Sequence, residues 1–291
     1  MAKSRATASP GRLSRANIRT HPTFLKFWAK KWVRSACPTR IREPRQWVFV
    51  VGCYNSGTTM LRDMIAQHPE TTVIPWEGVR FTDVLRRPED LGWVRMWCRC
   101  EEYVKTPSMG DYAARRRLLR DWSPWIQPSK SLVEKSIANV TRMRWLDRNL
   151  ARVSFVGITR NMWPVCEGIR RRAHARGQAL ASQRGRADYS IEECVQQWFR
   201  SREIMRQGAS HVRRWHHVTY EQVVADPSRV MAGIDEFLDL SRHTRELTTR
   251  MGDNAASVSR LTRLDVQRGE SEYSRLRILA DSGYWFISDI G

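Results

Sequence analysis

The stretch Val48-Phe-Val-Val-Gly-Cys-Tyr-Asn-Ser-Gly-Thr-Thr59 decides the fold. A continuous apolar run that ends in glycine is typical of a strand covered on both faces, and here a turn and a helix start follow it. Gly57 lets the backbone curl so that N–H groups converge on one anion, while Ser56, Thr58 and Thr59 add hydroxyl donors. The stretch predicts a phosphate-binding loop, and an ordinary strand, turn and helix is the alternative.

Four more short apolar runs follow along the chain, with helical stretches between them. The expected strands are Thr72–Trp76, Leu132–Lys135, Val153–Thr159 and His216–Tyr220. Strands that alternate with helices form βαβ units, and such units build parallel sheets. We therefore expect an α/β fold in which residues 46–291 form one domain, with a central parallel β-sheet flanked by helices.

The expected helices have recognisable ends. They span Thr58–Gln67, a segment from Pro164 to about Arg176 with Gly177 just beyond it, a segment that begins at the capping box Ser190 to Glu193, and one that begins at Asp226-Pro227. Residues 77–130 show no clear period and are expected to be irregular. Such an insertion, together with residues 241–291, is expected to form the acceptor side of a ligand cleft.

The positive charge of the chain is concentrated at its start. The formal net charge is +20, and residues 1–45 carry twelve Lys or Arg against Glu43 alone. We expect a basic N-terminal arm ahead of the domain, and a moderately basic body that suits a polyanionic ligand. No nucleic-acid partner is expected, although a basic arm that follows phosphates is the alternative.

Residues 24–34 in this arm mix aromatic side chains with lysines and an arginine, as a basic amphipathic helix does. The segment is expected to pack its aromatic stripe on the domain, and the alternative is peripheral contact with an anionic membrane surface. The chain has no apolar run of about 18 residues and no Sec-type signal. A cytoplasmic location is expected, with an N-terminal transit peptide as the alternative.

The cysteines and the loop exclude several classes of site. The six cysteines include no CxxC pair and no zinc-finger spacing, so no metal is expected. The loop has Thr58 where a GxxxxGK[ST] protein has its lysine, and the strand Val153–Thr159 leads into Arg160 rather than a magnesium-binding aspartate. These features disfavour an NTPase and leave a P-loop kinase as the nearest alternative enzyme. A cation at residue 160 suits a second phosphate.

Four segments, in order, resemble the PAPS-dependent sulfotransferase family, whose donor is 3′-phosphoadenosine 5′-phosphosulfate. GCYNSGTTMLRDMIAQHPE is similar to the family's strand, (K/R)-S-G-T-T loop and helix, and VSFVGITRNMWPVCEGIRRRA to its strand ending in Arg-Asp/Asn-Pro. VEKSIANV resembles the E-K-T-P segment, and VTYEQVVADPSRVMAGIDEFLDL the Y-E-D-L stretch. The resemblance covers about residues 46–240 and implies a P-loop-like sulfotransferase architecture.

This resemblance also implies a reaction and the residues that perform it. The family transfers a sulfuryl group from PAPS, without a metal, to a hydroxyl or less often an amine of a carbohydrate, lipid or small molecule. By position, the 5′-phosphate would be held by Ser56, Gly57, Thr58 and Thr59, the 3′-phosphate by Arg160, and the adenine side by Tyr220.

Three residues depart from the family pattern. Asn55 replaces the loop Lys or Arg that meets the leaving phosphate. Gly168 replaces the Ser that helps to hold the 3′-phosphate, and Met162 replaces Pro. The change at Asn55 removes a positive charge from the place where negative charge develops. A catalytically impaired nucleotide-binding protein with the same fold is therefore the second hypothesis.

Sulfuryl transfer by in-line displacement needs a base for the acceptor's proton and a cation at the leaving oxygen. The resemblance makes Glu77 the expected base and Lys135 the expected cation. The alternatives are a surface pair between Glu77 and Arg80, and a salt bridge from Lys135 to Glu134 or Asp147.

Overall fold

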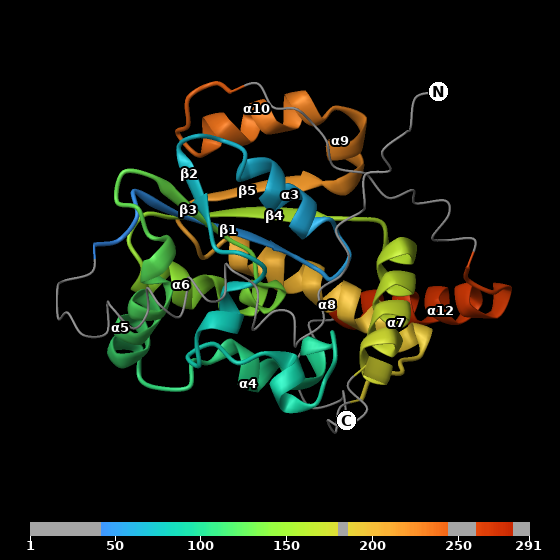
Figure 1. Ribbon diagram of the computed structural model, residues 1–291. Coiled ribbons are helices and arrows are strands. Elements are labelled where there is room, and N and C mark those ends of the chain that lie inside the picture. Colours follow the sequence, from blue (N-terminus) through green and yellow to red (C-terminus); the bar gives the residue numbers. More distant parts are fainter. Residues whose placement is uncertain (1–41, 180–185, 244–259, 282–291) are drawn as a thin grey trace, which may run out of the picture. The chain divides into compact units, whose positions relative to one another are not determined.

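The computed structural model of the chain describes residues 42–179, 186–243 and 260–281 (Figure 1). Nearly all of the predicted arm lies outside these residues, and so does the segment 24–34 with its predicted packing or membrane contact. Within the described ranges, no helix combines the length and the apolar character needed to cross a bilayer.

Five parallel strands form one sheet, in the order β2-β3-β1-β4-β5. Their bounds are Gln46–Gly52 (β1), Thr71–Val73 (β2), Ser131–Glu134 (β3), Val153–Thr159 (β4) and Trp215–Thr219 (β5). The α/β fold predicted from the sequence is confirmed. β2 is shorter than expected: the last ladder-like bond runs from the N–H of Ile74 to the carbonyl oxygen of Val133, and Trp76 has a left-handed backbone, with φ of 59°, that ends the extended run.

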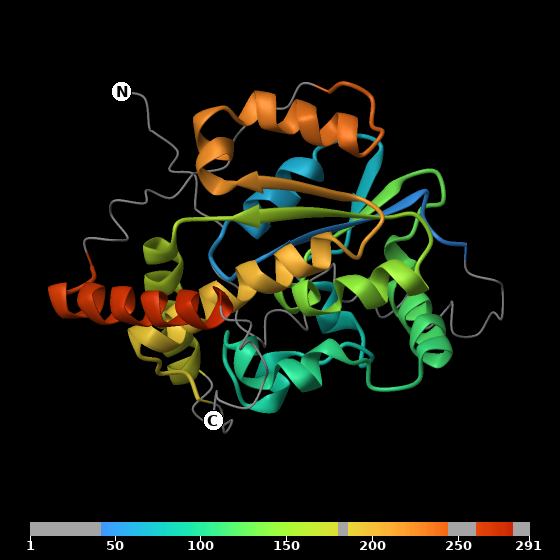
Figure 2. The same cartoon turned by 180° about the vertical axis from the view of Figure 1, so that it is seen from behind.

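Helices cover both faces of the sheet (Figures 1 and 2). α3, α9 and α10 lie on one face; α6 and α8 lie on the other, and α12 packs against α8. The bounds are Thr58–Ile65 (α3), Met143–Asn149 (α6), Met162–Ala179 (α7), Ile191–Ala209 (α8), Tyr220–Ala225 (α9), Pro227–Phe237 (α10) and Arg263–Asp281 (α12). The predicted starts of α8 and α10 are confirmed by the capping box at Ser190 and the side-chain cap of Asp226.

The predicted limits of α7 are wrong at both ends. The helix begins at Met162, where Asn161 Oδ1 accepts a hydrogen bond from the N–H of Trp163 at 3.0 Å, so Pro164 lies in the first turn. It also continues through Gly177 to Ala179. A glycine inside a helix costs only about 1 kcal/mol, so a glycine alone does not end one.

The expectation of an irregular segment over residues 77–130 is also wrong. It contains α4 (Glu101–Lys105) and α5 (Asp111–Trp122), with short 3₁₀ helices at Gly78–Phe81, Pro88–Leu91, Trp97–Cys100 and Ser123–Trp125; a fifth, Ile137–Arg142, follows β3. α5 buries Ala114, Leu118 and Trp122, which recur every four residues and so share one face. The other residues of α5 are mostly charged, so this apolar period is not apparent in the sequence.

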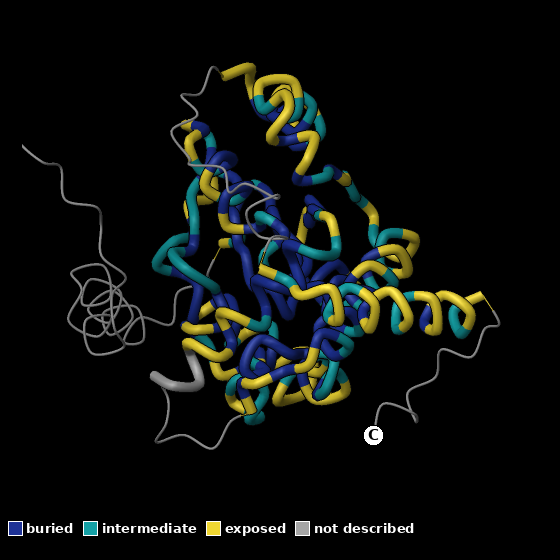
Figure 3. Tube along the Cα trace, turned by 90° about the vertical axis from the view of Figure 1, so that its right-hand side faces the viewer, coloured by how far each residue is buried: buried dark blue, intermediate teal, exposed yellow. Residues whose placement is uncertain are grey.

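The core lies on both faces of β1, which is buried along its whole length. Figure 3 shows the buried segments, in dark blue, gathered in the interior of the described domain. Val48 and Val50 join the apolar cluster that includes residues of α3 and α10. On the other face the ring of Phe49 packs 5.5 Å from Phe155 and 6.3 Å from Trp122. The helices on both faces explain why the strand has no polar alternation.

Candidate functional site

The predicted site residues follow neighbouring strands at one edge of the sheet. All five strands are parallel, so their carboxyl ends share that edge. Glu77 lies beyond the end of β2, Lys135 directly follows β3, the loop follows β1, and Arg160 follows β4. The loop after β1 leads into α3, which lies on one face of the sheet. The connection after β4 leads through α7 into α8, which lies on the other face. Open α/β sheets bind ligands at the carboxyl ends of their strands, at the point where connections from neighbouring strands go to opposite faces.

The loop between β1 and α3 has the shape and the donors of an anion site. Asn55 and Gly57 adopt left-handed conformations, with φ of 62° and 96°, and a Cβ at Gly57 would lie 2.8 Å from the ring of Tyr220. The first N–H groups of a helix have no acceptor within it, and α3 has no side-chain cap. Ser56 is 1% exposed, and its Oγ has no hydrogen-bond partner among the described residues. Buried donors without acceptors at a helix start suit a bound anion.

Arg160 is fastened directly to this loop. Its Nη1 donates a hydrogen bond to the carbonyl oxygen of Asn55 at 3.0 Å, and its guanidinium lies 3.9 Å from the ring centroid of Tyr220. Partial burial lowers the pKa of Arg160, and the neighbouring Tyr220 opposes this shift. The structure therefore brings the two predicted phosphate-holding elements together. Tyr220 itself is buried between Gly57 and Arg160 and supports both.

Glu77 and Lys135 form an ion pair, with 2.8 Å between Lys135 Nζ and Glu77 Oε1. The lysine side chain is 8% exposed and the glutamate side chain 27% exposed, so the carboxylate is the more accessible partner. The alternative salt bridges of Lys135 are not formed, because Glu134 binds other groups and Asp147 pairs with Arg213 at 3.1 Å. The predicted base and the predicted cation are therefore direct neighbours.

Glu134, which the sequence did not single out for the site, positions this pair. Its buried carboxylate accepts hydrogen bonds from the N–H of Gly78 and from Asn139 Nδ2, both at 2.7 Å, and from the hydroxyl of Ser136. Burial raises the pKa of Glu134, and the hydrogen bonds from Ser136 and from the N–H of Gly78 oppose the rise. Glu77 directly precedes Gly78, and Lys135 directly follows Glu134. The bond between Gly78 and Glu134 therefore fixes the backbone that carries both members of the ion pair. A buried acidic residue at a strand end was the available signal.

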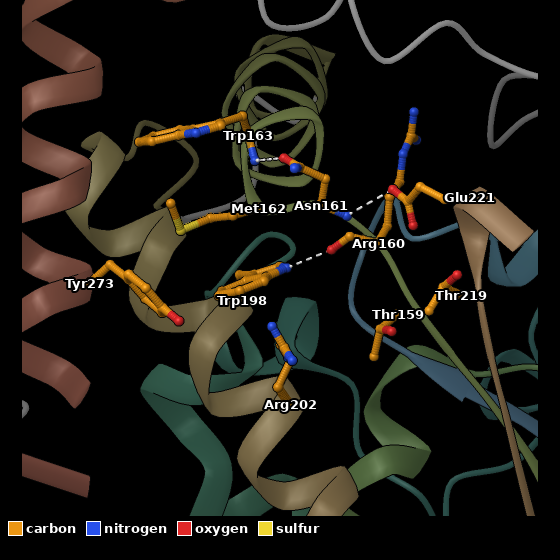
Figure 4. Close-up of a pocket in the computed structure, with 10 residues that line it drawn as sticks. All are labelled: Thr159, Arg160, Asn161, Met162, Trp163, Trp198, Arg202, Thr219, Glu221 and Tyr273. Atoms are coloured by element: carbon orange, nitrogen blue, oxygen red, sulfur yellow. Dashed lines mark hydrogen bonds between the residues drawn. The ribbon is translucent and has the colours of Figure 1, made fainter. Parts of the chain in front are cut away.

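A cavity of about 380 Å³ lies at the carboxyl ends of β4 and β5 (Figure 4). Its lining includes Arg160, Asn161, Trp163, Trp198, Arg202 and Tyr273. Trp198 Nε1 donates a hydrogen bond to the carbonyl oxygen of Arg160 at 2.9 Å, while the side chain of Arg160 extends away from Trp198 (Figure 4). The cavity thus adjoins the backbone of Arg160, and the sequence pointed to none of its α8 and α12 residues.

Comparison with known proteins decides the family. The model of a sulfotransferase family matches residues 47–244, which is more than half of the chain. The chain belongs to the sulfotransferase family. No curated protein matches this sulfotransferase by sequence.

A solved sulfotransferase structure shares the fold. The STF1 sulfotransferase of Mycobacterium tuberculosis H37Rv is 15% identical, with a TM-score of 0.52 over 86% of this chain and 81% of that one. The mouse sulfotransferase SULT7A1, in a structure complexed with PAP, is 12% identical, with a TM-score of 0.49 over 84% and 89% of the two chains.

Two departures of this sulfotransferase from the family pattern touch each other. A Cβ at Gly168 would lie 2.8 Å from Cγ and from Nδ2 of Asn55. Asn55 Nδ2 also lies 3.4 Å from the carbonyl oxygen of Val165, its acceptor in α7. The Asn55 side chain therefore occupies space that a side chain at residue 168 would need. Met162, the third departure, begins α7 and lines the cavity.

Arg95 reaches the same place from the segment between β2 and β3. Its Nη2 donates a hydrogen bond to Asn55 Oδ1 at 2.9 Å, and its guanidinium lies 4.7 Å from the ring centroid of Tyr54. The residue is 9% exposed and has a left-handed backbone, with φ of 60°. Sequence reasoning missed Arg95 because it lies 40 residues beyond the loop, in a segment predicted to be irregular.

Proposed function

We propose that this sulfotransferase transfers a sulfuryl group from PAPS to a hydroxyl or amine of a carbohydrate, lipid or small-molecule acceptor, by in-line displacement with Glu77 as the base. One observation carries the proposal: Arg160 donates to the carbonyl of Asn55 at 3.0 Å. That bond joins two anion-holding elements on adjacent strands, and the donor has two separate anionic ends. PAPS supplies the sulfuryl group and a phosphate leaving group.

The residues present fit such a donor. The loop offers the start of α3 and a buried hydroxyl at Ser56 that has no hydrogen-bond partner in the described part of the chain, so it suits the 5′ end. Thr58 and Thr59 begin the helix and add N–H donors of its first turn. Arg160 would hold the 3′-phosphate, since a guanidinium forms strong charge-assisted hydrogen bonds with phosphate. In this arrangement Tyr220 supports the guanidinium from behind.

Glu77 and Lys135 lie on the acceptor side of the loop: in the sheet order, β3, which precedes Lys135, is two strands away from β4, which precedes Arg160, and β2, which precedes Glu77, is three strands away. Glu77 accepts the acceptor's proton as the acceptor oxygen or nitrogen bonds to sulfur, and the electron pair of the broken S–O bond stays on the phosphate held by the loop. Lys135 orients the carboxylate of Glu77 through their ion pair. When Glu77 takes the proton, the lysine is released to face the leaving oxygen.

A first experiment tests the donor. In a thermal-shift measurement, adenosine 3′,5′-bisphosphate should raise the melting temperature, and ATP with Mg²⁺ should not. At 100 times its dissociation constant a ligand stabilises the folded state by about 2.7 kcal/mol. A response to ATP with Mg²⁺ alone would replace the sulfotransferase reaction by the kinase alternative.

A second experiment separates the enzyme from a catalytically impaired binding protein. The purified protein is incubated with ³⁵S-labelled PAPS and a panel of phenols, sterols, amines and sugars, and labelled products are sought. Incorporation that Glu77→Gln removes supports the enzyme. Tight binding of the bisphosphate, with no incorporation across the panel and no effect of Glu77→Gln, favours the binding protein.

A further inference from the structure

We infer that Arg95 supplies the positive charge that the loop lacks at residue 55, so that it binds the 5′-phosphate and neutralises that phosphate as it leaves. This inference rests on the proposed function and adds a residue to it. Bond cleavage between sulfur and the bridging oxygen leaves an electron pair on the phosphate. Without a cation on that side, the loop would meet this charge only with N–H and hydroxyl donors.

The position of Arg95 carries the inference. Arg95 Nη2 donates to Asn55 Oδ1 at 2.9 Å, so its charge lies one side chain away from the residue where the family has Lys or Arg. The guanidinium also packs on the ring of Tyr54, the preceding loop residue. Asn55 therefore does not replace the missing cation itself but holds it.

The backbone around the loop is built to hold this arrangement. Asn55 and Arg95 both have left-handed backbones, which are uncommon for residues other than glycine and are found at functional sites more often than elsewhere. Gly168 leaves the space into which the Asn55 side chain turns. The loss of a side chain at residue 168 and the loss of a cation at residue 55 are thus two parts of one rearrangement.

The charge of Arg95 acts on the loop itself. Burial raises the pKa of Cys53 to about 11, and the guanidinium of Arg95 counteracts part of that rise. Burial likewise raises the pKa of Tyr54; the carboxylates of Glu89 and Glu77 add to this rise, and the guanidinium of Arg95 opposes it. Arg95 therefore acts electrostatically on two residues of the loop.

Lys135 is not available for this role before Glu77 takes the acceptor's proton. Its ammonium is held by Glu77 at 2.8 Å on the far side of β1 from Arg160. A guanidinium keeps its charge under all conditions and presents a planar set of donors that matches phosphate. Arg95 is therefore suited to hold the donor before the reaction, when Lys135 is engaged by the base.

The test uses two nucleotides that differ by one phosphate. Calorimetry compares adenosine 3′,5′-bisphosphate with adenosine 3′-monophosphate, which lacks the group that Arg95 should bind. Arg95→Gln should weaken the bisphosphate about tenfold to a hundredfold and change the monophosphate by less than about twofold. Arg206→Gln, which removes an arginine that is 72% exposed on α8, is the matched control and should change neither affinity.

A second variant moves the charge instead of removing it. In Arg95→Gln combined with Asn55→Lys, the cation returns to the loop position that the family uses, and most of the lost bisphosphate affinity should return. If Arg95→Gln does not fold, Arg95→Lys makes the same comparison. It keeps the charge but loses the planar donors, so a smaller loss, again confined to the bisphosphate, is expected.

The outcomes separate the inference from the proposed function. Three results for Arg95→Gln would each overturn the role of Arg95. The first is an unchanged preference for the bisphosphate, and the second is an equal loss of affinity for both nucleotides. The third is a loss that follows the 3′-phosphate instead when adenosine 5′-monophosphate is tested. The donor assignment survives those results. It fails only if the unaltered protein shows no preference for the bisphosphate over either monophosphate.

Discussion

Nζ of Lys135 lies 2.8 Å from Oε1 of Glu77, and the two residues come from positions that follow β2 and β3 in the sheet. The lysine is nearly buried, whereas the glutamate reaches solvent. A buried ammonium needs a hydrogen-bond acceptor, and Glu77 supplies one. The contact with Lys135 holds the side chain of Glu77 in one orientation.

Glu77→Gln should lower the rate of sulfuryl transfer about 100-fold to 10,000-fold, because an amide cannot accept the acceptor's proton. The amide oxygen still accepts from Lys135, so the fold and the affinity for adenosine 3′,5′-bisphosphate should be retained. Turnover and calorimetry on the same preparation check this. The surface variant Glu102→Gln, which alters only the exposed pair with Lys105, is the control. Equal rates in both variants would exclude Glu77 as the base.

Lys135→Met should destabilise the folded state and reduce turnover, since it removes the ammonium that lies 2.8 Å from the carboxylate of Glu77. Removing one member of a buried ion pair costs about 3–5 kcal/mol, and the partial exposure of Glu77 places the expected loss below that range. Lys105→Met breaks an exposed pair and should change stability by less than about 0.5 kcal/mol. Urea unfolding of the two variants measures the difference. If Lys135→Met loses as little stability as Lys105→Met, the ion pair of Lys135 with Glu77 does not stabilise the fold.

Arg160→Gln should weaken adenosine 3′,5′-bisphosphate about tenfold to a hundredfold while leaving adenosine 5′-monophosphate nearly unaffected. The reason is that only the bisphosphate has the 3′-phosphate assigned to this guanidinium. Competition calorimetry with both nucleotides gives the two ratios. If both affinities fall together, Arg160 acts by holding the loop through the carbonyl of Asn55, and the 3′-phosphate must be bound elsewhere.

Gly168→Ala should destabilise the protein by about 1–3 kcal/mol, because its Cβ would lie 2.8 Å from Asn55 Cγ and force that side chain out of place. Gly233→Ala is the matched control: it also lies within a helix, and nothing lies within 4 Å of its added Cβ. That variant should be stabilised by about 0.5–1 kcal/mol through helix propensity. Chemical denaturation should show a loss of stability for Gly168→Ala and a gain for Gly233→Ala. Changes of the same sign in the two variants would refute the close packing of Gly168 on Asn55.

Asp265 links α12 to α7 in a pH-dependent way. A hydrogen bond from Arg170 lowers the pKa of Asp265 to about 2, so the folded state binds this proton less readily than the unfolded chain. Its contribution to stability is therefore complete above about pH 4 and is lost as the pH falls towards 2.

Asp265→Asn should consequently be less stable than the parent protein at pH 7, with a difference that shrinks below about pH 4. Urea unfolding at several pH values checks this, with Glu270→Gln on an exposed position of α12 as the control. A difference that stays constant down to pH 2 would show that the carboxylate acts through packing rather than charge.

Much of the fold is encoded locally and was predictable. The apolar run of β1, the glycine at φ 96° and the apolar periods of α3 and α10 each lie within about a dozen consecutive residues. The segment 77–130 was mispredicted because its helices are short and rich in arginine. α5 becomes apparent only where Trp122 packs on the rings of Trp47 and Phe49.

The parallel sheet, the loop Ser56 to Thr59 and the cation at Arg160 could be predicted from local sequence, because hydrophobic period and turn chemistry depend on neighbouring residues. Which charged groups pair with each other could be seen only in the folded chain. The pair Glu77 and Lys135 is separated by 58 residues, and Arg95 and Asn55 by 40. Such contacts depend on how the connections between strands pack at the sheet edge, and a side chain's type does not specify its distant partner.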